Sequence, residues 1–327
     1  MAETVKKNWS IADIPSQAGK LAVVTGATGG LGYETALGLA QAGAEVILAG
    51  RNEAKGADAV RRILAVAPGA KVRFGMVDLA SLASVAAFAK DLLAQGRPID
   101  ILVNNAAVMA TPTRQTTKDG FELQLGTNYL SHFALTAQLL SLLVHGGQTR
   151  VVQVSSLAHR QGKIHFNDLQ LERGYSPWKA YTQSKLAMLI FALELQKRSD
   201  ANGWGLISNA AHPGYARTDI IANGPGADSL QAKLRRLIGP LFSHPSAAGA
   251  LPTLYAATAP EARPAGYYGP GGFYEMKGPV AASFVAATAK EEVVAHRLWE
   301  ISEGLTGVAW TLAEGKKEGT VTVRAKV

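Results

Sequence analysis

Short apolar runs alternate with long amphipathic stretches along most of this chain, and this alternation constrains the possible folds more than any other feature. Strands that alternate with helical segments are typical of βαβ units, in which parallel strands share one sheet. The predicted strands are Leu21–Thr25, Val46–Ala49, Val72–Val77, Ile99–Val103, Val151–Val154 and Gly205–Ala210. The predicted helices are Leu31–Ala42, Glu53–Val66, Leu82–Gln95, Leu123–Leu143 and Ala180–Lys197. We therefore expect an α/β fold with a doubly wound parallel sheet of about seven strands and helices on both faces.

The 327 residues are predicted to form a single domain, 1–327, because no linker, repeat or low-complexity segment divides the chain. Residues 1–19 form an N-terminal extension. Asn223–Pro245 mixes Gly and Pro with a short amphipathic piece, Leu230–Ile238, and predicts a substrate-loop insertion over about 221–245. The C-terminal tail, 307–327, is polar, and its Thr320–Arg324 is expected either to add an edge strand or to be mobile.

The composition excludes several classes of protein. Hydrophobic residues make up 47% of the chain and charged residues 18%, which allows a sizeable core and argues against disorder. The chain has no cysteine, so disulfides, thiolate metal sites and a catalytic cysteine are excluded. The histidines show no metal-ligand spacing, and we expect no metal site. No segment reaches the roughly 18 consecutive apolar residues of a membrane span. The N-terminus lacks the apolar middle region of a secretory signal, so we expect a soluble, cytoplasmic protein.

The net charge of +8 does not indicate a nucleic-acid partner. The basic residues stand singly or in pairs, such as Lys6-Lys7 and Arg235-Arg236, without a long run or interleaved aromatic residues. Scattered lysines that keep the protein soluble explain most of this charge. A positive field would also steer an anionic, phosphate-bearing cofactor toward its site.

A glycine-rich turn joins the first predicted strand to the first predicted helix. It reads Gly26-Ala27-Thr28-Gly29-Gly30-Leu31-Gly32. Glycine allows a sharp turn and a close approach of the backbone to a pyrophosphate, and the N-terminus of the helix supplies free N–H groups. Strand, turn and helix in this order predict a single-domain Rossmann fold. Its expected contacts to a dinucleotide come from Gly26, Thr28, Gly30, Leu31 and Gly32.

The residue after the second predicted strand bears on which nicotinamide cofactor is bound. Arg51 stands where an acidic residue would accept hydrogen bonds from the ribose hydroxyls of NAD. An arginine instead offers several donors to a 2′-phosphate, so we expect NADP(H). Glu53 lies two residues further on and keeps NAD(H) possible.

The glycine spacing, Thr25-Gly26-x-x-x-Gly30-x-Gly32, resembles that of the short-chain dehydrogenase/reductase family. The resemblance runs from Lys20 to about Thr306 and is strongest to the branch of retinol dehydrogenases and light-dependent protochlorophyllide reductases. The stretches that carry it are Gly126-Thr127-Asn128-Tyr129-Leu130-Ser131-His132-Phe133, Val154-Ser155-Ser156-Leu157-Ala158-His159 and Arg297-Leu298-Trp299-Glu300-Ile301-Ser302-Glu303.

The resemblance implies further cofactor contacts. Asp78-Leu79 is similar to the pair that contacts adenine in the family, although Asp78 or Ser81 could also cap the following helix. Asn104-Asn105-Ala106 is similar to the family's Asn-Asn-Ala stretch, with Ala107 replacing a glycine. Pro213-Gly214 would turn the chain under the nicotinamide, and Thr218 would contact its carboxamide or the phosphates. His212 is expected to be a packing residue at a strand end.

Two segments match the family's Tyr-x-x-x-Lys motif. Tyr175–Lys179 contains Pro177, which disfavours a continuous helix through all five residues. Tyr181–Lys185 continues into a strong helical pattern, so the two side chains share one face. We therefore predict Tyr181 and Lys185 as the catalytic pair, which also contacts the cofactor.

The chemistry explains this pairing. A free phenol has a pKa near ~10, and lowering it to ~7 requires about 4 kcal/mol in favour of the phenolate. A neighbouring ammonium and the positive ring of the oxidised nicotinamide both act in this direction. Tyr181 would then exchange a proton with the substrate oxygen as a general acid or base.

Two further catalytic residues are implied by the resemblance. Ser156 would hydrogen-bond the substrate oxygen, with Ser155 as the competing candidate. Asn128 lies in an otherwise apolar helical segment, where the family has a bend that holds a water of the proton relay. The alternative for Asn128 is an exposed polar position on the helix.

The substrate is expected to be a bulky hydrophobic alcohol, ketone or aldehyde. Met109, Leu157 and Tyr215 are the predicted pocket residues, with Ile220, Leu230 and Leu241 nearby. Leu157–Ala180 forms an insert also seen in the retinol dehydrogenase branch. Its polar and aromatic residues, His159, His165, Tyr175 and Trp178, are expected either to edge the pocket or to pack at the surface.

Two other functions are considered. The first is a reductase of a conjugated C=C bond, which the missing cysteine disfavours. The second is a non-catalytic NADPH-binding protein, which the presence of both Tyr181 and Lys185 disfavours. The resemblance also implies a homodimer or homotetramer formed through Leu123–Leu143 and Ala180–Lys197, although burial in the core would explain their apolar character equally well.

Overall fold

The computed structural model describes residues 8–109, 111–144, 148–215 and 244–312. The strands are β1 (Leu21–Thr25), β2 (Glu45–Gly50), β3 (Val72–Met76), β4 (Ile101–Asn104), β5 (Arg150–Val154), β6 (Ile207–Ala211), β7 (Tyr267–Pro270) and β8 (Val280–Ala282). The longer helices are α1 (Gly30–Gln41), α2 (Glu53–Val66), α3 (Leu82–Gln95), α5 (Ser131–Gln138), α7 (Pro177–Asn202), α10 (Ser246–Thr258) and α11 (Glu292–Thr306). Shorter elements are η1 (Ile11–Asp13), α4 (Leu123–Leu125), η2 (Gly126–Leu130), α6 (Leu140–Val144), η3 (Leu157–Gln161), η4 (Phe273–Glu275) and η5 (Ala287–Lys290).

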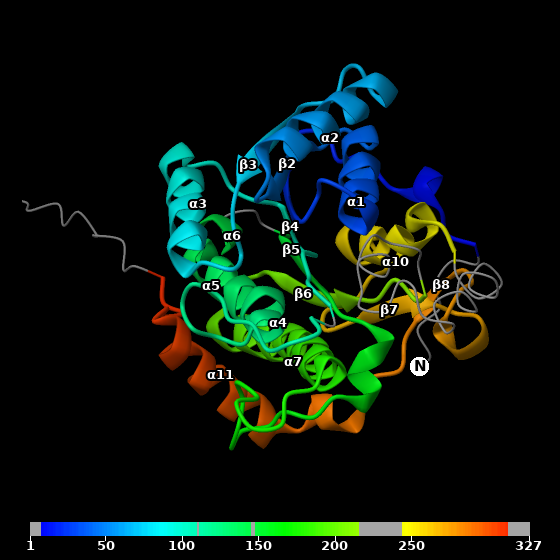
Figure 1. Cartoon of the computed structure of the whole chain (residues 1–327). Coiled ribbons are helices and arrows are strands. Elements are labelled where there is room, and N and C mark those ends of the chain that lie inside the picture. The colour runs from blue at the N-terminus through cyan, green and yellow to red at the C-terminus, as the bar shows by residue number, and fades with distance from the viewer. Residues whose placement is uncertain (1–7, 110, 145–147, 216–243, 313–327) are drawn as a thin grey trace, which may run out of the picture.

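The strands form one sheet in the order β3-β2-β1-β4-β5-β6-β7-β8 (Figure 1). All neighbouring pairs are parallel except β7 and β8, which are antiparallel. The doubly wound α/β fold is therefore confirmed, with eight strands in the described part of the chain rather than about seven. The sequence order of the strands reverses between β1 and β4, and doubly wound sheets bind ligands at such a point.

The two faces of the sheet are covered by different helices. In β1, Leu21 and Val23 belong to the core under α3, α5, α7 and α11, whereas Ala22 and Val24 belong to the core under α1, α2 and α10. This alternation follows from the two-residue repeat of a strand. Figure 1 shows α1 and α10 beside one another on one face, and α7 beside α11 on the other.

Helix starts follow local chemistry. Ser81 caps α3 by accepting a hydrogen bond from Ser84 N. Of the two predicted capping residues, Asp78 and Ser81, it is therefore Ser81 that caps the helix. The helix α7 begins at Pro177, three residues before the predicted start, because Ser176 caps it and proline is tolerated in the first turn. Tyr175 therefore lies outside the helix.

The prediction of one continuous helix over Leu123–Leu143 was wrong. The segment divides into α4, the π-helical turn η2, α5 and α6. In η2 the backbone N–H of Ser131 bonds to Gly126 O, five residues back, which widens the helix at Asn128. Apolar periodicity does not distinguish a π-helical turn from an α-helix.

Both ends of the described chain pack into the cores. Trp9, in the N-terminal extension, is buried and contacts the ring of Tyr255 edge-on at 5.3 Å. Trp310, in the predicted polar tail, is buried against Phe133 and Trp299. Most of the insertion predicted over 221–245, and the strand predicted at Thr320–Arg324, lie outside the described residues.

The helices predicted to form an oligomer interface are covered within the chain. Nearly all side chains of α5 and of Ala180–Ala192 in α7 are buried, and α11 packs against both helices. Burial in the core thus explains their apolar character, and the oligomeric state stays a prediction. Within the described ranges, no helix is both long and apolar enough to cross a bilayer.

Candidate functional site

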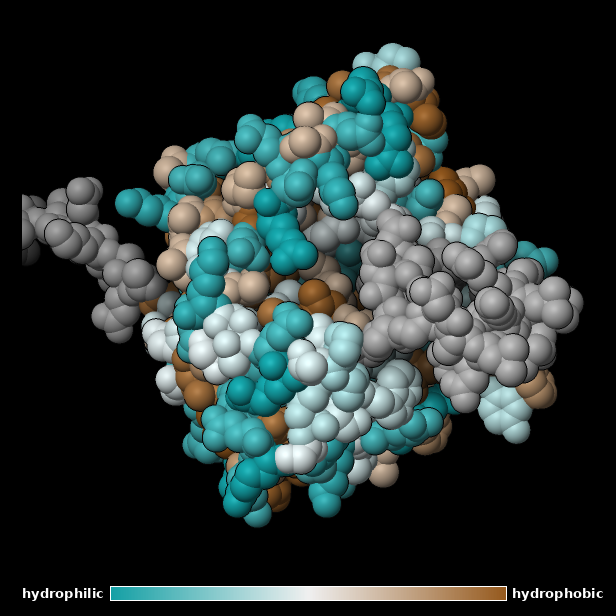
Figure 2. Space-filling view, viewed as in Figure 1, coloured by the Kyte–Doolittle hydropathy of each residue, from teal (hydrophilic) through white to brown (hydrophobic). Residues whose placement is uncertain are grey.

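A cleft of ≈ 780 Å³ opens at the carboxyl ends of the parallel strands. In Figure 2, hydrophilic residues cover most of the visible surface, and hydrophobic residues show in the hollow at its centre. Many of the predicted site residues line it: Gly26, Thr28, Gly30, Leu31, Gly32, Arg51, Asp78, Leu79, Asn105, Ala106, Met109, Ser156, Leu157, Tyr181, Lys185, Pro213, Gly214 and Tyr215. Asn104 and Asn128 lie behind this surface, and Thr218 lies outside the described residues.

The glycine-rich turn leaves no space for side chains at two positions. A Cβ on Gly32 would lie 2.3 Å from Gly26 O, and a Cβ on Gly26 would lie 2.9 Å from Ala106 Cα. Gly26 and Gly30 also have φ of +66° and +53°, which favour glycine. The exposed backbone and the start of α1 thus fit a pyrophosphate, as the dinucleotide prediction requires.

Two arginines stand near the turn. Arg51 is exposed at the end of β2, lines the cleft, and has no hydrogen-bond or ion-pair partner among the described residues. Arg62, from α2, donates to Thr28 O at 3.2 Å and lies 4.1 Å from the centre of the Tyr33 ring. The site therefore offers an unpaired guanidinium and a second, fixed one beside the same turn.

The residues after β3 and β4 support the cofactor side of the cleft. Asp78 accepts a hydrogen bond from Ala80 N at 3.1 Å and lies 3.5 Å from the ammonium of Lys118. Asn105 Nδ2 donates to Thr25 O at 2.7 Å, which ties the loop after β4 to the end of β1. The side chain of Asn104 is fully buried and donates to Thr136 and Gln153, so its part in the site is in holding the loop.

Tyr181 and Lys185 face one another from one side of α7. The ammonium of Lys185 lies 5.9 Å from the centre of the Tyr181 ring and donates to Val154 O at 2.9 Å. Burial lowers the pKa of Lys185 to about 7. Burial raises the pKa of Tyr181, and its hydrogen bond with Ser156 acts in the opposite direction. The phenol is therefore protonated in the protein without a bound cofactor.

The geometry separates the two candidate serines. Ser155 is buried, and its hydroxyl donates to Lys185 O at 2.8 Å. Ser156 hydrogen-bonds Tyr181, and its hydroxyl also accepts from Ala158 N at 3.2 Å at the start of η3. Ser156 is thus the serine whose hydroxyl is next to the phenol.

Asn128 is fully buried in the π-helical turn, which excludes the exposed alternative. Its amide binds both backbone groups of Val108, at 2.8 and 2.9 Å, and donates to Ser184 Oγ at 2.9 Å. Asn128 therefore connects the loop after β4 with the helix that carries Tyr181. Its role in a proton relay stays a prediction.

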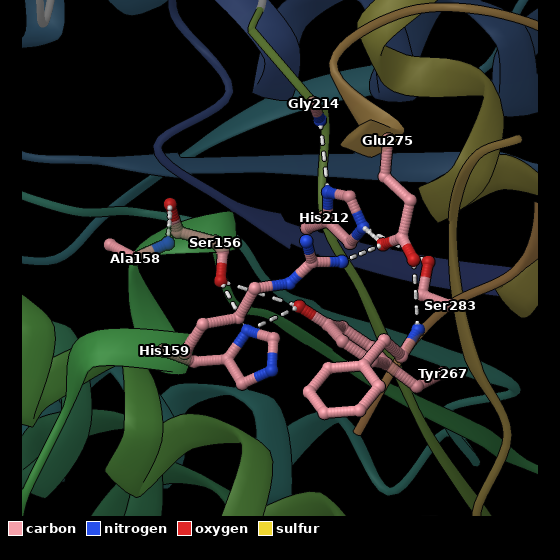
Figure 3. A network of polar contacts seen from close by, with 10 residues as sticks. Ser156, Ala158, His159, His212, Gly214, Tyr267, Glu275 and Ser283 are labelled. Carbon is pink, nitrogen blue, oxygen red and sulfur yellow. Dashed lines mark hydrogen bonds and ion pairs between the residues drawn. The ribbon is translucent and has the colours of Figure 1, made fainter. Parts of the chain in front are cut away.

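The turn at Pro213-Gly214 is held by a network that sequence analysis did not find (Figure 3). The imidazole of His212 is buried, accepts from Gly214 N at 3.1 Å through Nδ1, and therefore donates from Nε2 to Glu275 Oε2 at 3.0 Å. Glu275 also pairs with Arg160 at 2.8 Å. Burial acts to raise the pKa of Glu275, but hydrogen bonds from His212 and Phe284 and the charge of Arg160 lower it to about 2. His212 is thus the expected packing residue and also orients the turn.

The same network reaches Ser156 from another side. His159 Nδ1 donates to Ser156 O at 2.7 Å, and the hydroxyl of Tyr267 lies 3.4 Å from the same oxygen (Figure 3). Burial lowers the pKa of His159 to about 4, so the ring is neutral. His159 therefore packs behind the site and holds Ser156, and it does not line the cleft.

Trp178 and Tyr175, also from the insert, differ in whether they reach the cleft. Trp178 lines the cleft, is 48% exposed, and lies 5.8 Å from the Tyr181 ring. The hydroxyl of Tyr175 is hydrogen-bonded to Thr111 Oγ1 at 2.6 Å, and Tyr175 does not line the cleft. Ile220, Leu230 and Leu241 lie outside the described residues.

The glycine-rich turn at the reversal of strand order defines a dinucleotide-binding α/β protein. The chain belongs to the short chain dehydrogenase family of oxidoreductases, whose family profile matches residues 20–225.

Named relatives share most of the chain. Polyprenol dehydrogenase of Mus musculus is 40% identical over 306 residues, covering 92% of this chain and 88% of the relative. Retinol dehydrogenase 12 of Homo sapiens is 40% identical over 293 residues, covering 89% and 88%.

Solved structures agree with the fold. The crystal structure of an uncharacterised protein from Mycobacterium Paratuberculosis has a TM-score of 0.78 and 39% identity, covering 94% of this chain and all of that one (100%). A protein from Beutenbergia cavernae, crystallised with bound NADP at low occupancy, has a TM-score of 0.57 and 25% identity, covering 76% and 92%. The resemblance to the retinol dehydrogenase branch is thus confirmed.

Proposed function

We propose that this protein is an NADP(H)-dependent alcohol dehydrogenase or carbonyl reductase that acts on a bulky hydrophobic alcohol, ketone or aldehyde. One observation carries the proposal: Tyr181, Ser156 and Lys185 line the same cleft as the glycine-rich turn. The cleft therefore combines a proton donor for the substrate oxygen with a binding site for a dinucleotide.

The preference for NADP(H) rests on Arg51. Its guanidinium at the end of β2, without a partner in the part of the chain that the structure describes, offers donors for a 2′-phosphate, and Arg62 adds a second positive charge near Thr28. The bound NADP of the Beutenbergia cavernae protein supports the same choice. When bound, the cofactor supplies or accepts the hydride.

Tyr181 acts as the proton donor in the direction of reduction. Its pKa is raised by burial, so the phenol carries the proton that the substrate oxygen needs. The Ser156 hydroxyl, hydrogen-bonded to Tyr181, donates to the same substrate oxygen and helps to stabilise the charge that develops there. Ser155 and His159 hold the ends of this arrangement through Lys185 O and Ser156 O.

Lys185 supplies the charge that makes the proton transfer reversible. With its pKa lowered to about 7, it exchanges a proton near neutral pH, and its protonated form favours the phenolate of Tyr181. In oxidation, Tyr181 therefore accepts the proton of the alcohol.

The hydrophobic substrate class rests on the other lining residues. Met109, Leu123, Leu157 and the exposed ring of Trp178 present apolar surface to the cleft that Tyr181 lines. Two relatives are named for polyprenol and retinol, which are hydrophobic alcohols.

The test measures oxidation of NADPH and of NADH with bulky hydrophobic ketones and aldehydes and with small polar ones. We expect faster turnover with NADPH and the bulky compounds, and a loss of about 10³-fold in kcat for Tyr181→Phe with NADPH affinity retained. Tyr175→Phe, in the other Tyr-x-x-x-Lys match, is the control: it removes a hydroxyl bonded to Thr111 and Gln124 outside the cleft and should keep kcat near the wild-type value. NADPH binding without turnover of any carbonyl compound would contradict the proposal.

A further inference from the structure

His132 connects the cofactor side and the catalytic side of the site. It is fully buried on α5, four residues after Asn128. Its Nδ1 lies 2.8 Å from Asn128 O, and its Nε2 lies 2.9 Å from Thr25 Oγ1. Both ring nitrogens therefore have a partner, and the two partners belong to different elements, the turn η2 and the strand β1.

The hydrogen-bond directions follow from the partners. A backbone carbonyl only accepts, so His132 Nδ1 carries a proton and donates to Asn128 O. Burial outweighs the hydrogen bond that His132 donates to Asn128 O and lowers the pKa of His132 to about 4, and the charge of Lys185 acts in the same direction. The ring is therefore neutral, and its Nε2 accepts the hydroxyl proton of Thr25.

The Thr25 contact bears on the cofactor side. Thr25 Oγ1 directs its proton to His132 Nε2 at 2.9 Å in preference to the more distant Val103 O at 3.3 Å, and it accepts from the backbone N–H groups of Asn105 and Ala106, at 2.9 and 3.0 Å. Ala106 is the residue that a Cβ on Gly26 would meet first, at 2.9 Å from Ala106 Cα. The orientation of one hydroxyl thus fixes the loop that backs the glycine-rich turn.

The Asn128 contact bears on the catalytic side. The π-helical turn places the amide of Asn128 on Ser184, whose hydroxyl donates to Tyr181 O at 2.8 Å. The hydrogen bond from His132 Nδ1 to Asn128 O holds the backbone of the same turn. Movement of this turn would therefore displace the first part of α7, which carries Tyr181.

We propose that His132 is a positioning residue with two separable roles: through Nε2 it orders the cofactor-binding loop, and through Nδ1 it holds the Asn128 turn and thereby Tyr181. The second role rests on the proposed function, and the first needs only that the cleft binds NADPH.

Two variants separate the roles, because each keeps one polar atom near its present place. In His132→Asn, the amide nitrogen is as many bonds from Cβ as Nδ1, so the bond to Asn128 O is kept and the Thr25 contact is lost. In His132→Gln, the amide end reaches the place of Nε2, so the Thr25 contact is kept and the bond to Asn128 O is lost. NADPH affinity is measured by fluorescence titration, kcat by turnover of the best carbonyl compound, and folding by thermal denaturation.

We expect a crossed result. His132→Asn should weaken NADPH binding about fivefold and keep kcat within about twofold, whereas His132→Gln should lower kcat about fivefold and keep the affinity. Thr258→Val is a matched control, since it removes a buried side-chain bond, to Leu254 O at 2.7 Å, on the other face of the sheet. It should lower the melting temperature and change neither quantity.

Equal changes in both quantities for both variants, or wild-type values for both, would overturn the proposal. If the variants do not fold, Thr25→Val removes the same hydroxyl from the other side, and unchanged NADPH affinity there would refute the Nε2 role. If the wild type turns over no carbonyl compound, the proposed function fails, and the affinities of the Asn and Gln variants still decide whether His132 orders the cofactor-binding loop.

Discussion

The two sides of the cleft are built in different ways. The cradle, Gly26–Gly32 backed by Asn105 and Ala106, is made of backbone, glycine and one helix start, and all of it except Asn105 and Ala106 comes from one short stretch of the chain. The wall is Ser156–Arg160 with His212–Gly214, together with Tyr267, Glu275 and Ser283, which pack behind them and do not line the cleft. It is made of side chains from separate segments. The cradle therefore tolerates little added volume, whereas the wall depends on charge and hydrogen bonding.

The largest effect is expected for added volume in the cradle. Gly32→Ala places a Cβ against the backbone oxygen of Gly26, which cannot move aside like a side chain. A strain of about 3 kcal/mol predicts roughly a hundredfold weaker binding of NADPH. Gly304→Ala is the matched control, because a Cβ there meets open space. Equal NADPH affinities of the two variants in a fluorescence titration would remove the volume argument.

A charge change in the wall should have the next largest effect. Glu275→Gln keeps the shape of the side chain and removes the charge that holds Arg160 and His212. The loss of a charged hydrogen bond, about 1.5–2 kcal/mol, predicts a ten- to thirtyfold loss in kcat/KM. Glu292→Gln, in an exposed ion pair with Lys197, is the control and should change kcat/KM little. Identical kcat/KM for the two variants would show that the wall does not depend on charge.

Arg51, at the edge of the cradle, should set the preference for NADPH over NADH, and the effect of its loss should be smaller. Arg51→Ala removes the guanidinium at the end of β2 that lines the cleft. A charge-assisted bond of about 1.4 kcal/mol predicts a tenfold fall in the preference for NADPH over NADH, measured as a ratio of kcat/KM. Arg61→Ala, on the exposed side of α2, should leave that ratio unchanged. A tenfold fall in both variants would indicate a general effect of charge.

The smallest effect concerns acid stability, in which the two sides should also differ. The cradle residues Gly26–Gly32 have no titratable side chain, whereas burial lowers the pKa of His159 to about 4. The unfolded chain therefore binds more protons than the folded one between the usual histidine pKa and about 4, so stability falls as the pH falls through this window.

His159→Asn keeps a donor for Ser156 O and removes this titration. The slope of stability against pH should then flatten by about 1 kcal/mol per pH unit, a few degrees in melting temperature. His296→Asn, at an exposed position, is the comparison and should leave the slope as it is. A wild-type slope in His159→Asn, measured by thermal denaturation at several pH values, would mean that His159 does not titrate in this range.

The contrast between cradle and wall also explains what could be predicted from the sequence. Strand, glycine turn and helix are adjacent in the chain, so the cradle could be recognised from local patterns alone. The choice of Tyr181 over Tyr175 was also local, since Pro177 decides where α7 begins. The six predicted strands and the cap of α3 at Ser81 follow from the same short-range rules.

The wall could not be predicted because its partners are distant in the chain. Glu275 lies in a Gly-rich segment without any periodic pattern, and only the fold brings it to His212, 63 residues earlier. The sequence pattern did not single out Tyr267, whose hydroxyl lies 3.4 Å from Ser156 O in the folded chain. The π-helical turn at Asn128 was missed because its apolar neighbours repeat as they would in an α-helix.

The burial of Trp310 has a consequence for the synthesis of the chain. Its ring packs on Phe133, Phe191 and Trp299, so the larger core is completed by a residue close to the end of the described chain. A growing polypeptide on the ribosome therefore exposes this aromatic surface until almost all of α11 and the segment after it have emerged. During that interval the nascent chain presents the kind of apolar surface that chaperones bind.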